Sequence, residues 1–183
     1  MLVKSGWILA ICTFLVISLH GQSSRLQGNG SIDFVSNAPL EIIDAASPEL
    51  KGIIDISNNE FAFTVPIISF EGFNSPLQRE HFNENYLESS QFPNATFVGK
   101  IIEDLDYSTI GKMEIRAKGS LSIHGVVSKR IIPATIDIQQ NSISIEAKFL
   151  VPLVDHNIRI PKIVYMKIAE EINVVVSAEF AIN

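Results

Sequence analysis

Residues 143–149, with the sequence ISIEAKF, alternate strictly between apolar and polar side chains. Successive side chains of a β-strand point to opposite faces of the sheet. The apolar residues of this stretch therefore share one face, and Ser144, Glu146 and Lys148 share the other. One buried and one solvated face is typical of antiparallel sheets. The stretch favours an antiparallel, all-β fold.

The same period of two recurs along most of the chain. It is as clear in residues 112–123 and 172–182 as in 143–149, and it is weaker in five further stretches. The eight expected strands are residues 31–36, 50–56, 60–68, 95–102, 112–123, 130–138, 143–149 and 172–182. Turn-forming residues separate several of them, at Asn58-Asn59, His124-Gly125 and Gln140-Asn141.

Proline residues mark interruptions of this pattern. Pro66, Pro133 and Pro152 lack a backbone donor, so we expect them at strand ends, edges or bulges. Two proline-led segments, 76–91 and 161–171, have apolar residues near helical spacing or are rich in helix formers. A serine directly before the first of them is suited to cap a helix that begins with proline. Both segments are expected to be short helices in connections between strands.

Eight strands with one apolar face each must form two packed sheets or close into a barrel. Closure removes exposed sheet edges, and the interior of an eight-stranded barrel is either filled by side chains or holds one small ligand. The expected inward residues are largely apolar, and Ala117, Gly119 and Ala147 among them are small. We therefore expect an eight-stranded antiparallel barrel with two short helical insertions. A two-sheet sandwich is the alternative.

The first 22 residues, MLVKSGWILAICTFLVISLHGQ, have the features of a secretory signal peptide. Lys4 precedes an apolar stretch of about 13 residues, and small or polar residues follow it. A membrane span needs roughly 20 apolar residues, so an uncleaved anchor is the weaker interpretation. Cys12, the only cysteine, offers a poor lipoprotein motif. We expect residues 1–22 to be removed and residues 23–183 to form a periplasmic or secreted domain without cysteine.

The composition excludes several classes of protein. The net charge is −6 and lysine and arginine do not cluster, which argues against nucleic-acid binding. The 46% of hydrophobic residues excludes intrinsic disorder.

Candidate catalytic and metal-binding residues are sparse. The histidines that follow residue 22 lie in different connections, and a Gly-x-Ser-x-Gly turn is lacking, so we expect no enzyme. His81 and Glu84 have a spacing that could present two metal ligands, but further ligands are not beside them. We therefore expect neither a metal nor a cofactor.

Four segments together resemble the YceI-like family of lipid-binding proteins of the bacterial periplasm. They are FAFTVPIISFEGFNSPLQREHFNENYLES (61–89), FPNATFVGKI (92–101), GSLSIHGVVSKRIIPATI (119–136) and VPLVDHNIRIPKIV (151–164). The resemblance extends over about residues 30–180, and their order and spacing carry it more than any single motif. It implies a lipocalin-like barrel whose apolar tunnel holds a polyisoprenoid or a similar long-chain amphiphile.

The candidate ligand-binding residues are inward positions of the expected strands. The most aromatic stripe lies in the strand at 60–68, and alternation alone does not distinguish a ligand-lining wall from an ordinary core. The resemblance favours a lining. The candidates are Phe34, Phe61, Phe63, Val65, Phe97, Ile115, Phe149 and Phe180. Lys129, Arg130, Arg159 and Lys162 could meet a phosphate head group, although solvation at the surface is commoner for lone cations.

The function that these features predict is binding of a lipid. Burying one CH₂ group is worth roughly 0.8 kcal/mol, so a chain of several prenyl units needs no strong polar anchor. We expect a non-enzymatic carrier or sequestering protein for a polyisoprenoid. The alternative is an interaction or structural module with a filled barrel core. Transient membrane contact and a dimer are left open, and no nucleic-acid partner is expected.

Export has a direct test. Protein recovered from an export-competent bacterial host should have lost about 22 residues by signal cleavage and should carry no acyl group. Intact-mass spectrometry measures both quantities. A mature species that still contains Cys12 would contradict both the cleavage and the cysteine-free domain.

Overall fold

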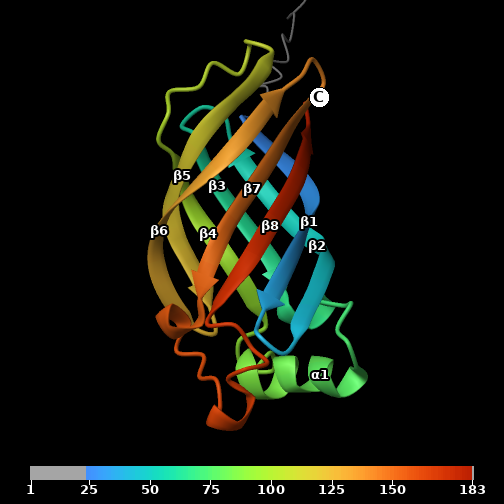
Figure 1. Ribbon diagram of the computed structural model, residues 1–183. Coiled ribbons are helices and arrows are strands. Elements are labelled where there is room, and N and C mark those ends of the chain that lie inside the picture. Colours follow the sequence, from blue (N-terminus) through green and yellow to red (C-terminus); the bar gives the residue numbers. More distant parts are fainter. Residues whose placement is uncertain (1–23, 183) are drawn as a thin grey trace, which may run out of the picture.

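The structure is a computed structural model that describes residues 24–182, so the expected signal peptide at 1–22 lies outside the described residues. Eight antiparallel strands form one closed barrel, in which β8 pairs with β1 (Figure 1). The strands are β1 (Arg25–Asn37), β2 (Ile42–Asp55), β3 (Glu60–Pro66), β4 (Asn94–Ile101), β5 (Gly111–Ile123), β6 (Val126–Ile138), β7 (Ser142–Pro152) and β8 (Glu171–Ala181). The expected barrel is confirmed and the two-sheet sandwich is wrong.

Strands β1 and β2 are longer than their sequences indicate, and a bulge explains the difference in β2. The register shifts between Gly30 and Ile32 of β1, which pair with Leu50 and Ser47 of β2. Ser47 and Leu50 are both buried although they stand three positions apart. A bulge breaks the period of two, so alternation finds only the part of β2 that follows it.

The helical insertions are shorter than expected. Helix α1 (Pro76–His81) begins as predicted, with the Ser75 hydroxyl accepting a hydrogen bond from the backbone N–H of Gln78 at 3.2 Å. A π-helical turn, η2 (Phe82–Tyr86), continues it. Residues 87–91 then leave the helix, and Glu88 has a left-handed φ of 44°.

The expected helix at 161–171 is wrong. The structure has only a single 3₁₀ turn there, η4 (Lys162–Val164). The backbone beyond it bonds to the β1–β2 hairpin: Leu40 N–H donates to the Met166 carbonyl, and Ala169 N–H donates to the Ser36 hydroxyl. Lys167 N–H and Ile168 N–H still donate to the Val164 carbonyl, but the long-range bonds to the hairpin use backbone groups that a continued helix would need. Two further 3₁₀ turns, η1 (Ile67–Ser69) and η3 (Leu153–His156), follow β3 and β7.

The barrel is packed most tightly in the half that lies away from α1. Its largest side chains there are at most 1% exposed; they are Ile54, Ile136, Ile138, Ile143 and Phe180. The β4–β5 loop adds Leu105 and Tyr107 to the same core. Burial raises the pKa of Tyr107 to about 12. Figure 1 shows α1 lying across the opposite, lower end of the barrel.

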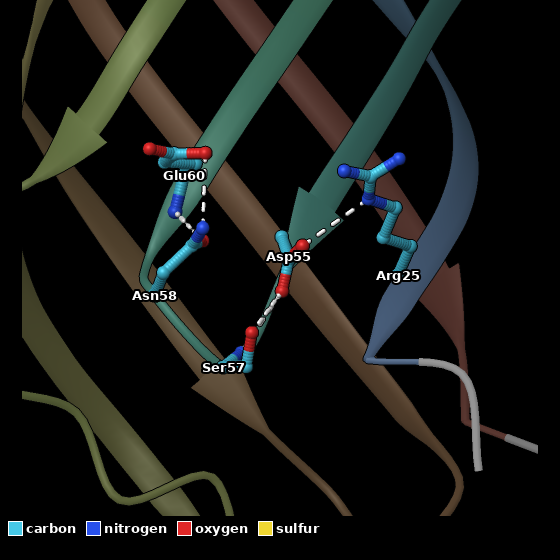
Figure 2. A network of polar contacts seen from close by, with 5 residues as sticks. All are labelled: Arg25, Asp55, Ser57, Asn58 and Glu60. Atoms are coloured by element: carbon cyan, nitrogen blue, oxygen red, sulfur yellow. Dashed lines mark hydrogen bonds and ion pairs between the residues drawn. The ribbon is translucent and has the colours of Figure 1, made fainter. Parts of the chain in front are cut away.

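The β2–β3 turn is fixed by polar contacts at the tightly packed end (Figure 2). Asp55 accepts a 2.6 Å hydrogen bond from the Ser57 hydroxyl and a 3.2 Å hydrogen bond from Nε of Arg25. These contacts, that of Ser57 first, lower the pKa of Asp55 to about 2 despite its partial desolvation. The expected turn at Asn58-Asn59 is present, and Asn59 takes a left-handed φ of 61°.

The proline positions agree with the expectation and reveal an irregularity. Pro66 and Pro152 end β3 and β7. Pro133 lies within β6, next to the point where pairing with β7 stops at Ala134 and Ala147.

His156 makes stability depend on pH. It is 0% exposed, and its Nδ1 lies 3.2 Å from the Val126 carbonyl, to which it donates in the neutral form. Burial lowers its pKa. The unfolded chain therefore takes up a proton at His156 at a pH where the folded chain does not, and acidification favours the unfolded state.

We expect the free energy of unfolding to fall as the pH drops from about 7 to 5.5, by at most about 1.4 kcal/mol per pH unit for this one proton. This range lies above the ordinary pKa of the carboxylates. Denaturant unfolding across the range measures the slope, and His156→Gln should flatten it. An equal slope in both proteins would contradict the assignment.

Candidate functional site

Two adjoining cavities lie inside the barrel, the larger at the end that faces α1 and the smaller farther along the barrel, away from α1. The larger has a volume of about 330 Å³ and the smaller about 90 Å³. Ile32, Val65 and Ala95 line both, so the two cavities meet at these side chains. Ligand-binding pockets usually measure about 300–1,000 Å³ and are mostly apolar. The larger cavity alone reaches that range.

Four phenylalanines form one wall of the larger cavity. Phe34 of β1 meets Phe70, Phe73 and Phe82, with ring centroids 5.4–6.0 Å from its own. Phe82, the first residue of the π-helical turn, also contacts Phe70 and Phe73. The segment after β3 thus folds back and supplies aromatic side chains that close this end of the barrel.

Polar side chains gather at one rim of the larger cavity. Gln78 of α1 donates a 3.0 Å hydrogen bond from Nε2 to Oε1 of Glu41. Nζ of Lys167 lies 4.0 Å from Oε2 of the same carboxylate. Leu77, which lines the cavity beside them, is 58% exposed, so the cavity reaches the surface next to α1. The site thus has a polar rim and an apolar interior.

The structure distributes the sequence-predicted residues over three places. Phe34 lines the larger cavity, Val65 lines both, and five others line the smaller one: Phe61, Phe63, Phe97, Ile115 and Phe149. Phe180 lines neither; its side chain is fully buried and its ring centroid is 6.0 Å from that of Phe63. Ligand contact by these residues stays a prediction.

Two glycines explain why the Phe180 ring fits where it does. A Cβ at Gly52 would lie 2.7 Å from the Phe63 ring and 2.8 Å from the Phe180 ring. A Cβ at Gly28 would lie 2.5 Å from the Phe180 ring. Their missing side chains leave the space that Phe180 fills, and this packing ends the smaller cavity.

Sequence reasoning missed the lining residues that come from connections. They include Phe70, Phe73, Phe82, Leu153, Ile158 and Ile168. The apolar spacing within 76–91 was the available signal for Phe82, but it predicts only a short helix in a connection between strands and does not place Phe82 in the barrel interior. For the other five, local alternation carries no information, because their backbones are irregular.

The polar side chains that the sequence offered as metal ligands or head-group contacts make few interactions that would mark a binding site. His81 lines the larger cavity, and in residues 24–182 there is no group of three His, Cys, Asp or Glu side chains arranged to hold a metal. Of the candidate cations, Lys129 donates to the Ser120 hydroxyl, and Arg130 donates to the Leu150 carbonyl, both at 2.6 Å. No helix within the described part of the chain is long and apolar enough to cross a membrane.

Phe63 and Phe180 form a matched pair for testing whether the smaller cavity is hollow. Phe63→Ala should cost about 1–2 kcal/mol of stability in the lipid-free protein, because one side of its ring faces the cavity and lacks packing partners. Phe180→Ala should cost about 3–5 kcal/mol, the usual loss for a phenylalanine in a filled core. Denaturant unfolding of both variants without lipid measures the difference. Equal, core-sized losses would contradict a hollow interior at Phe63.

Comparison with known proteins identifies the family. The sequence profile described as the YceI-like domain matches residues 18–180. Among curated protein sequences, none matches this chain.

Solved structures share the fold at low sequence identity. A polyisoprenoid-binding domain from Saccharophagus degradans has a TM-score of 0.72 and 12% identity over 86% of this chain and 98% of its own. Burkholderia cenocepacia BcnA has a TM-score of 0.68 and 14% identity over 82% and 95%. The Campylobacter jejuni YCEI protein has a TM-score of 0.61 and 15% identity over 98% and 99%. Because the family profile covers nearly the whole chain, and the barrel agrees with these structures, this chain belongs to the YceI-like domain family.

Proposed function

We propose that this protein binds a polyisoprenoid or a similar long-chain amphiphilic lipid inside the barrel. One observation carries the proposal: two adjoining apolar cavities, of about 330 and 90 Å³, lie behind a rim that holds the polar groups. A chain buried there gains roughly 0.8 kcal/mol for each CH₂ group removed from water. The similar Saccharophagus degradans domain is described as polyisoprenoid-binding, which supports this ligand class.

The arrangement suggests how such a lipid would lie. Its head group would rest at the rim, where Gln78 and Lys167 offer donors and Glu41 offers an acceptor. Its chain would run past Phe34 and Phe82 toward the smaller cavity. Specificity would then depend on the rim contacts and on the fit of the chain.

The biological role that fits this binding mode is a non-enzymatic carrier or store. Binding by burial alone needs no cofactor and no reaction at the ligand. We propose that the protein is exported and holds its lipid in the periplasm or outside the cell. An interaction module with a filled core is the second candidate, and the tightly packed half around Phe180 is the observation that favours it.

Lipid binding is tested first on the purified protein before any lipid is removed or added. Native mass spectrometry and organic extraction of the purified protein should reveal a co-purifying lipid with a long apolar chain. Delipidated protein should then bind prenyl alcohols with an affinity that rises with chain length. If neither a co-purified lipid nor an added prenyl alcohol is bound, the lipid-binding function is wrong and the filled module is favoured.

A pair of tryptophan variants on β4 locates the ligand. Ala95 lines both cavities, so Ala95→Trp should fill their junction and weaken binding of long prenyl alcohols by about tenfold or more. Val98 is on the same strand, but its side chain is 52% exposed. Val98→Trp should therefore leave binding unchanged. Equal affinity in both variants would place the lipid elsewhere.

A further inference from the structure

The barrel wall has an irregular place between β6 and β7. Cα pairing of these two strands extends only from Ile138 and Ile143 to Ala134 and Ala147, although both strands continue. We call the unpaired stretch, residues 126–133 of β6 and 148–152 of β7, the β6–β7 seam. On their other sides, β6 pairs with β5 and β7 pairs with β8 along these same residues. Each strand at the seam is thus held from one side.

Side chains, and not a ladder of backbone hydrogen bonds, span the seam. Arg130 donates from its guanidinium to the Leu150 carbonyl at 2.6 Å and lies 3.5 Å from the Asp155 carboxylate. At the end nearer α1, the His156 ring bonds to the Val126 carbonyl. Pro133 has no N–H with which to extend the ladder. The seam is therefore a gap in the backbone pairing, bordered by strands that are paired on their outer sides and bridged by the side chain of Arg130.

The strands β2 and β3 provide a contrast. The first part of β2 also extends beyond its pairing with β3. There, however, the chain that follows β3 occupies the place of the missing strand, and Ala46 pairs with Glu71 through two backbone hydrogen bonds of 2.8 and 2.9 Å. Among the described residues, no equivalent backbone bridge is found at the β6–β7 seam.

Apolar side chains lie on both sides of the seam. On the inside, Ile132 and Phe149 of the seam, and Ala147 next to it, line the smaller cavity. On the outside, Val127, Ile131 and Leu150 are 61%, 56% and 44% exposed. A hydrocarbon chain that crossed the wall here would meet apolar surface at both faces.

The tightly packed half of the barrel blocks a long hydrocarbon chain along the barrel axis, so such a chain has to pass through the wall. A chain that enters at the rim and fills both cavities meets the Phe180 core, which leaves no space along the barrel axis. Elsewhere, parting two paired strands would break several backbone hydrogen bonds. In the part of the chain that the structure describes, the polar contacts across the seam are those of Arg130 and, at the end nearer α1, the hydrogen bond of His156 to the Val126 carbonyl; a chain that passes beside Arg130 has to displace only the former.

We propose that the β6–β7 seam is a lateral portal through which the hydrocarbon chain of the bound lipid passes. The inference rests on the proposed lipid-binding function and adds a ligand class: amphiphiles whose chains are longer than the two cavities can contain. Arg130 acts as a positioning residue, because it holds the seam shut when no chain lies in it.

The test bridges the seam from outside. In a Cys12→Ser background, Ile131→Cys and Leu150→Cys are joined by a short, reducible bis-maleimide linker; both side chains are exposed and line neither cavity. The matched control joins Ser144→Cys and Glu179→Cys, which are register partners across the fully paired β7 and β8. Affinities for a short and a long prenyl alcohol are measured before and after reduction of the linker.

The seam linker should weaken binding of the long alcohol by about tenfold or more and leave the short alcohol unchanged. Reduction should restore the long-chain affinity, and the control linker should change neither. Equal effects on both alcohols, or none on either, would overturn the portal while lipid binding stands. If the unlinked parent binds neither alcohol, the proposed function fails and the portal fails with it.

Arg130→Met offers a second readout without a linker. Removing the bridge should raise the association rate of the long alcohol and tighten its binding, because the Arg130 contacts stabilise the closed, free state and are lost when the chain passes through the seam. Arg116→Met is the control, because the Arg116 guanidinium binds Glu103 at 2.8 Å and does not span the seam. Its rates for the long alcohol should equal those of the parent protein. Unchanged rates in Arg130→Met would show that the arginine does not hold the portal shut.

Discussion

The pairing of β8 with β1 is the contact on which the rest of the molecule depends. It adds the last set of backbone hydrogen bonds to a row of eight strands and leaves the sheet without a free edge on that side. Because backbone pairing holds most of the wall together, the interior does not have to be filled to keep the strands in place. A closed sheet can therefore be solid in one half and hollow in the other.

Where the hollow part lies follows from the sizes of the inward side chains. Around Phe180, two glycines and a group of isoleucines fit together so closely that added atoms would collide. Toward α1, the inward residues include smaller ones such as Ala95, and around Phe34 of β1 the aromatic rings Phe70, Phe73 and Phe82 come from connecting segments. The chain thus closes the roomy end with residues from outside the sheet, which can differ in shape without disturbing the strand register.

The architecture could be predicted from sequence, because alternation and turn residues are local signals. Around Ile115 and Ile145, successive side chains alternate between more buried and more exposed positions, as their sequences indicate. The start of β2 and the fate of residues 161–171 could not be predicted, because a bulge and long-range bonds to Ser36 decide them. Within the candidate site, alternation identified inward positions but not their depth along the barrel axis. Phe149 and Phe180 look equivalent in sequence, yet one borders a cavity and the other lies in the solid core.

The π-helical turn after α1 has a consequence for how such a barrel changes over time. Its widened hydrogen bond joins the Leu87 N–H to the Phe82 carbonyl, five residues earlier, at 2.9 Å. Deleting one residue within the turn would restore ordinary α-helical spacing and rotate Phe82 by roughly 100° relative to Leu87, given 3.6 residues per turn. The floor of the larger cavity would then present a different side chain. One insertion or deletion at this turn is thus a route by which chains sharing this barrel could diverge in the shape of the molecule they enclose.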